Sequence, residues 1–123
     1  MQLIYIGLFG GLGCVSRFLV SGWTHALVGR GLPYGTLSVN ALGSFLLGLL
    51  MVIGLRSALL PADVRIGLTV GFMGGFTTFS TFSYETLRLL EDGSLWQAGT
   101  NVVLNLTVCL LFAFLGMQLA RQF

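Results

Sequence analysis

The sequence contains very little charge. Only 8% of its 123 residues are charged, and all six basic residues are arginine, with no lysine. Soluble domains carry roughly a quarter charged residues, so this chain cannot cover itself with a hydrated surface. Hydrophobic residues make up 55% instead. The composition indicates an integral membrane protein, and the length predicts one domain.

Groups that serve catalysis or bind metals are also scarce. The one histidine, His25, is expected in a loop, and the two cysteines, Cys14 and Cys109, fall inside expected helices. Neither a disulfide framework nor a nucleophile–base pair can be assembled from so few groups. The sequence has no phosphate-binding glycine loop and no basic patch for nucleic acid. We therefore expect neither an enzyme nor a nucleic-acid-binding protein.

Long uncharged stretches predict four membrane-spanning helices. A span needs about 20 apolar residues, and the stretches between charges place the helices at about 2–23, 34–55, 66–89 and 95–120. The first lacks the basic start and the small-residue cleavage site of a signal peptide, so we expect it to be retained. The fold class is predicted as an all-α membrane protein.

The arginines give no clear bias for one orientation. Four spans place Arg56, Arg65 and Arg121 on one side of the membrane, and the other three, Arg17 among them, on the opposite side. Orientation normally follows an excess of basic residues in cytoplasmic loops. Equal counts predict insertion in both orientations and permit an antiparallel dimer, although a weak bias can also hide one fixed orientation. Four helices are few to enclose a polar path, which also favours an oligomer.

The stretch GGFTTFSTFS, residues 74–83, is a poor helix interior at membrane depth. Paired glycines followed by paired threonines predict a break near 74–78. Freed backbone groups are tolerated there only inside protein or beside water, and their carbonyls can hold a small cation. Beyond the break, Phe79 and Phe82 share one helix face. Their positive ring edges can contact an anion; the alternative is that both rings pack against lipid or core.

Further polar side chains lie inside the spans. Asn40 in the second span either bridges helices or offers N–H donors to an anion. In the fourth span Asn101, Asn105 and Cys109 follow at steps of four and form one polar stripe, which would be costly against lipid. The hydroxyls of Ser80 and Thr81 also need partners. These side chains predict a polar route through the protein.

Two ionisable residues and two glycine repeats complete the candidates. Arg17 is placed to attract anions to a vestibule and Glu85 to lie at the far end of the route. For each, the alternative is an interfacial side chain that reaches toward headgroups. Glycines recur every four residues at 67, 71 and 75, and at 7 and 11. This spacing favours close helix packing.

Three segments together resemble one known family. GGLGCVSRF, GTLSVNALGSFLLG and GFMGGFTTFSTFSYE are similar to the Fluc/CrcB fluoride channels, and the resemblance covers essentially the whole chain. It implies passive, fluoride-selective export across the bacterial inner membrane, which lowers cytoplasmic fluoride and confers fluoride resistance. It also implies a dual-topology homodimer of antiparallel four-helix subunits in lipid, with two pores. The sequence departs from the family pattern at Cys14, where alanine is common.

The resemblance also implies roles for individual residues. Phe79 and Phe82 match the rings that contact fluoride, and Asn40 matches the pore asparagine. The resemblance places Arg17 near the vestibule and Glu85 after the second ring. The polar track on the fourth helix is carried here by Asn101, Asn105 and Cys109. The backbone carbonyls of Gly74 and Thr77 match the positions that hold a central sodium ion between subunits.

Two further functions are compatible with a short four-helix chain. Small drug or cation exporters have this size too, but they rely on a membrane-embedded carboxylate, usually in the first helix. The first carboxylate here is Asp63, which argues against an exporter. A purely structural subunit of a larger complex would account for the glycines. It would leave Asn40 and the polar stripe without a function.

Overall fold

The computed structural model describes residues 1–56 and 58–123, and these residues form helices joined by short connections. In chain order the elements are α1 (Gln2–Val28), α2 (Tyr34–Arg56), α3 (Ala62–Ile66), η1 (Gly67–Phe72), α4 (Met73–Phe76), α5 (Phe79–Glu91) and α6 (Leu95–Ala120). The segments from α3 to α5 follow one another as a bent third helix, in which η1 is a stretch of π-helix. The part of the chain described is therefore a bundle of four helices.

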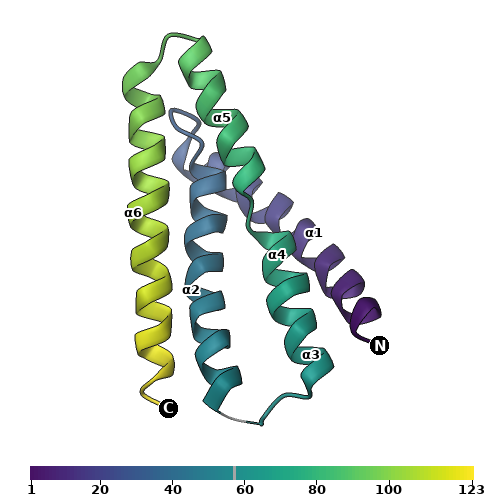
Figure 1. Cartoon of the computed structure of the whole chain (residues 1–123). Helices are drawn as coiled ribbons and strands as arrows, with labels where there is room; N and C mark the ends of the chain where they lie inside the picture. The colour runs from purple at the N-terminus through teal and green to yellow at the C-terminus, as the bar shows by residue number, and fades with distance from the viewer. Residues whose placement is uncertain (57) are drawn as a thin grey trace.

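The connections place the chain termini at the same end of the bundle (Figure 1). The segment leading into α3 also lies at that end, whereas the turns after α1 and after α5 lie at the opposite end. Helices α1, α2 and α6 are long and apolar enough to cross a membrane. The bent third helix runs between the same two ends. This is the architecture of a multi-pass membrane protein.

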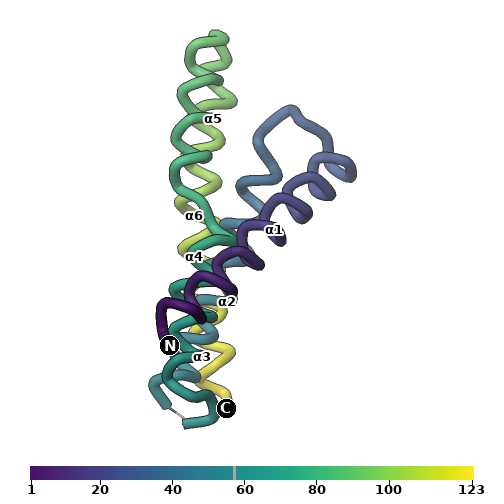
Figure 2. The backbone as a smooth tube through the Cα atoms, turned by 90° about the vertical axis from the view of Figure 1, so that its right-hand side faces the viewer, coloured from purple at the N-terminus to yellow at the C-terminus, as the bar shows by residue number. Residues whose placement is uncertain are grey.

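Helix α1 extends beyond its expected end near residue 23. Nothing in the sequence WTHALV, residues 23–28, interrupts a helix, and α1 ends where Gly29 adopts a φ of 97°, which favours glycine. The expectation that His25 lies in a loop is therefore wrong. His25 lies in the last turn of α1, with Nδ1 3.3 Å from the carbonyl oxygen of Gly29. Toward this end α1 diverges from α5 and α6 (Figure 2).

Glycine brings α1 against the third helix. A Cβ on Gly71 would lie 2.8 Å from the carbonyl oxygen of Ile6, and one on Gly75 would lie 2.5 Å from that of Gly10. The packing role predicted for the repeat at 67, 71 and 75 is thus confirmed. On α1 the interface glycines are Gly10 and Gly13, whereas a Cβ at residue 7 or 11 meets nothing within 4 Å.

The third helix is broken at two residues. Thr77 and Thr78 have extended backbones, with φ/ψ of −93°/158° and −153°/119°. The predicted break at 74–78 is therefore present but narrower, because Gly74 still belongs to α4. Threonine is a weak helix former with a preference for extended backbone. Helix α5 restarts with Thr78 as its N-cap, whose Oγ1 accepts from the Thr81 N–H at 3.2 Å.

Candidate functional site

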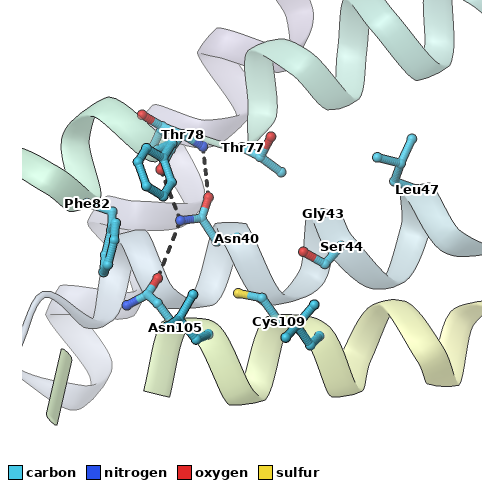
Figure 3. Close-up of a pocket in the computed structure, with 12 residues that line it drawn as sticks. Asn40, Gly43, Ser44, Leu47, Thr77, Thr78, Phe82, Asn105 and Cys109 are labelled. Atoms are coloured by element: carbon cyan, nitrogen blue, oxygen red, sulfur yellow. Dashed lines mark hydrogen bonds between the residues drawn. The ribbon is translucent and has the colours of Figure 1, made fainter. Parts of the chain in front are cut away.

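A cavity of about 290 Å³ lies where the break meets α2 and α6. Its lining mixes amides, hydroxyls, a thiol, phenyl rings and leucines: Asn40, Gly43, Ser44, Leu47, Thr77, Thr78, Phe79, Phe82, Asn105, Leu106, Cys109 and Leu110. None of these lining side chains belongs to an aspartate, glutamate, arginine or lysine. Figure 3 shows Asn40 joined by hydrogen bonds to Thr78 at the break and to Asn105 on α6, with Ser44 and Cys109 further along α2 and α6. The structure thus brings Asn40, part of the polar stripe of the fourth span and the two phenyl rings into one uncharged site, where a few amides and hydroxyls lie among apolar side chains.

Asn40 binds the broken backbone directly. The N–H of Thr78 donates to Asn40 Oδ1 at 2.8 Å, and Asn40 Nδ2 donates back to the carbonyl oxygen of Thr78 at 3.0 Å (Figure 3). This reciprocal pair replaces bonds that the backbone loses when the helix opens, as burial requires. Asn40 therefore stabilises the break that the glycines and threonines favour.

The polar stripe on α6 continues from Asn40. Asn40 Nδ2 also donates to Asn105 Oδ1 at 3.4 Å, and Asn105 Nδ2 donates to the carbonyl oxygen and to Oδ1 of Asn101 at 2.9 and 3.1 Å. Both N–H groups of Asn40 are thus engaged within the protein. The 3.4 Å bond is the longest of the set, and it is the one that an anion in the cavity can replace at least cost.

The two phenyl rings lie at different depths. Phe82 is 8% exposed and Phe79 is 74% exposed. Their ring centroids are 5.3 Å apart at an interplanar angle of 53°, a tilted arrangement that aromatic quadrupoles favour. Both rings line the cavity. The structure therefore places the pair beside the amides, with Phe79 open to whatever surrounds this chain.

Three of the predicted polar residues lie outside the cavity lining. Ser80 and Thr81 are exposed on α5, where Thr78 Oγ1 donates to Thr81 Oγ1 at 3.0 Å. Asn101 is only 2% exposed, but it is tied to Asn105 rather than facing the cavity. Their roles in the route stay predictions. Cys109 lines the cavity together with Ser44.

The two ionisable candidates are not brought to this cavity. Glu85 lines a separate cavity of about 250 Å³ with His25, Arg30 and Arg88, and Thr36 Oγ1 donates to its carboxylate. This second cavity is lined by the last turn of α1, by residues 30–33 and by the second half of α5. Arg17 lies half-buried near the middle of α1. Within this single chain Arg17 lines neither of these two cavities, so its role at a vestibule stays a prediction.

The break also changes the hydrogen bonding of the Gly74 and Thr77 carbonyls, for which the family resemblance implies a role. In an unbroken helix the Gly74 carbonyl would accept from the N–H of Thr78, and the Thr77 carbonyl from that of Thr81. Here Thr78 donates to Asn40 Oδ1 and Thr81 donates to Thr78 Oγ1. Both carbonyls thus lose the donors that an unbroken helix would give them.

Three hydroxyl residues around the site were not predicted from the sequence. Thr36 and Ser44 lie one turn to either side of Asn40, and Thr86 lies one turn after Phe82. Residues four apart share a helix face. Extending each predicted site residue by one turn would have found all three.

Comparison with known proteins gives a consistent result. Residues 4–117 match the family described as CrcB-like protein, Camphor Resistance (CrcB). The fluoride-specific ion channel FluC of Syntrophotalea carbinolica is 70% identical over 122 residues, covering 99% of both chains. That of Geobacter metallireducens is 56% identical, covering 99% of this chain and 98% of the relative. With this coverage, the chain belongs to the CrcB-like family.

Proposed function

We propose that this chain is a fluoride-specific ion channel that lets fluoride leave the cell passively. The observation that carries the proposal is the uncharged cavity at the helix break, where two amides, several hydroxyls and two phenyl rings converge in a largely apolar lining. The relatives that share its full length are named as fluoride-specific ion channels. The chain is accordingly a transport protein of a multi-pass membrane family and not an enzyme.

The lining suits a small and strongly hydrated anion. Conduction requires binding strong enough to enter the pore and weak enough to leave it. Amide N–H groups, hydroxyls and the positive edges of phenyl rings donate without a full charge. A lysine or arginine in the cavity would hold fluoride too tightly, and none lines it. Fluoride can therefore exchange water in steps for the Nδ2 donor of Asn40, whose bond to Asn105 is the longest of the set, and for the thiol of Cys109.

We further propose that two copies assemble in antiparallel orientation. Support comes from the balanced arginines of the sequence and from residues that this chain leaves uncovered. Phe79 is 74% exposed although it lines the cavity. Gly74 is exposed as well, and a Cβ there would meet nothing within 4 Å. A second copy against the break would cover both, and the two copies would contain two routes.

The same arrangement favours a structural sodium ion. The carbonyls of Gly74 and Thr77 have lost their helical donors and would hold the ion together with their equivalents in the partner. A bound cation supplies fixed positive charge that favours anion entry. The chain's own contribution is the break itself, which Asn40 holds open through the backbone of Thr78.

The decisive experiment is efflux from liposomes measured with a fluoride electrode, with chloride efflux measured in parallel. We expect rapid, voltage-driven fluoride efflux without a pH gradient, and chloride efflux slower by orders of magnitude. Exhaustive replacement of sodium by a larger cation should slow the fluoride flux. Equal fluoride and chloride rates would contradict a fluoride-specific route, and proton-coupled efflux of an organic cation would indicate an exporter instead.

A further inference from the structure

A continuous chain of hydrogen bonds links the two ends of the first turn of α5 through α2 and α6. It passes in order through Thr78, Asn40, Asn105, Asn101, Thr86 and Phe82. We refer to it as the amide chain. It starts at the backbone N–H of Thr78 and ends at the backbone carbonyl of Phe82. The segment that carries both phenyl rings is therefore held at both ends.

The last link depends on Thr86. Asn101 Nδ2 donates to Thr86 Oγ1 at 2.9 Å, and Thr86 Oγ1 donates to the carbonyl oxygen of Phe82 at 2.8 Å. The hydroxyl thus serves as acceptor and donor at once, which a hydroxyl can do and a methyl group cannot. Every bond along the amide chain points the same way, so the loss of one link leaves a buried donor without its acceptor.

We infer that Thr86, together with Asn101, is a positioning residue for the fluoride route. This inference rests on the proposed function. Neither residue lines the cavity, so each acts on the route through the first turn of α5. Their bonds fix the rotation of α5 against α6 and thereby the place of the Phe82 ring beside Asn105.

A purely local role for Thr86 accounts for only part of the geometry. Threonine hydroxyls in helices commonly donate to the carbonyl four residues earlier, and Thr86 does so. Such a local bond does not need an amide from another helix. Asn101 is 2% exposed, and its side-chain N–H reaches Thr86 on α5 from α6. Burial of an amide is costly without a partner, which makes Thr86 the partner that Asn101 requires.

The test compares Thr86→Val with Thr86→Ser. Valine preserves the shape and removes the hydroxyl, whereas serine keeps the hydroxyl and removes a methyl group. Fluoride efflux from liposomes should fall about tenfold in Thr86→Val, as expected for one lost hydrogen bond with a buried donor left behind. Discrimination between fluoride and chloride should weaken with it. Thr86→Ser should stay near the parent rate, and size-exclusion chromatography should show equal assembly for all three proteins.

A second readout reports the ring position without any flux. 4-Fluorophenylalanine at position 82 gives one ¹⁹F resonance, which Thr86→Val should shift and Thr86→Ser should leave near its parent position. An unshifted resonance and unchanged selectivity in Thr86→Val would overturn the inference, as would equal damage from Thr86→Ser. Absence of fluoride efflux in the parent protein would instead refute the proposed function. The ¹⁹F shift would then still show whether Thr86 positions the ring.

Discussion

Helices α2 and α6 lie side by side over most of the length of α2 (Figure 1), but the two halves of their interface are built differently. Toward the chain termini, glycines remove side chains between the helices. A Cβ on Gly116 would lie 2.1 Å from the carbonyl oxygen of Phe45, and one on Gly48 would lie 2.5 Å from that of Ala113. Toward the other end, Asn40 and Asn105 place amide side chains between the helices. We call these two parts of the interface the glycine half and the amide half.

The difference shows how one helix pair can combine rigidity with a polar route. Membrane helices gain stability from close van der Waals packing, which small residues allow. In the glycine half the helices pack closely in this way, and the glycines add no polar side chain to the interface. In the amide half, Asn40 and Asn105 are polar, and they gain partners in an ordered network. The cavity reaches from the amide half as far as Leu47 and Leu110, next to the glycine half.

The largest expected effect comes from placing a charge in the amide half. Asn40→Asp replaces two N–H donors by a carboxylate beside the anion route. It also removes the donors to Thr78 and Asn105. Repulsion between like charges in a low-dielectric site is strong, so fluoride efflux should fall to the background of protein-free liposomes. The packing of α2 against α6 should be preserved, because the glycine half is untouched, and size-exclusion chromatography should show the same assembly as for the parent protein. Retained efflux would show that the route avoids Asn40.

The glycine half is tested by a matched pair on α6. Gly116→Ala would drive a Cβ into the backbone of Phe45, whereas Gly99→Ala adds a Cβ that meets nothing within 4 Å. Overpacking costs about 1–3 kcal/mol, so Gly116→Ala should lower the thermal unfolding midpoint in detergent. Gly99→Ala should leave it unchanged or raise it, since alanine is the better helix former. Equal midpoints for the two variants would mean that α2 and α6 do not pack as closely as described.

Sequence patterns were sufficient for the helices and for the existence of the break. Uncharged apolar runs of about 20 residues are typical of membrane spans, and paired glycines and threonines are poor helix formers. The end of α1 could not be placed, because nothing between residues 23 and 28 marks a stop before Gly29. Local pattern also failed to show what holds the break. The Asn40–Thr78 pair joins residues 38 positions apart, and such pairing depends on tertiary packing.

The candidate site, too, was predictable where local sequence was enough and not where tertiary packing decides. Five predicted residues do come together at one cavity: Asn40, Asn105, Cys109, Phe79 and Phe82. They could be predicted because each has a side chain that is unfavourable in lipid or lies beside the break. Ser80 and Thr81 were identified in the same way but lie outside the lining. Their hydroxyls belong to the exposed start of α5, where Thr78 and Thr81 bond locally. A sequence shows that a hydroxyl needs a partner, but not whether that partner is local or an ion.

The smallest expected effect concerns the two rings at the edge of the amide half. Phe79→Ile and Phe82→Ile keep apolar bulk but remove the positive ring edge, so each should lower fluoride efflux several-fold without changing assembly. Phe82 is the more informative of the two, because its 8% exposure leaves lipid little access to it in this chain. If Phe82→Ile conducts at the parent rate, the ring packs without touching fluoride, and the amides alone carry selectivity. If only Phe82→Ile is impaired, Phe79 belongs to the surface that a partner covers. Impairment of both would place the two rings on one route.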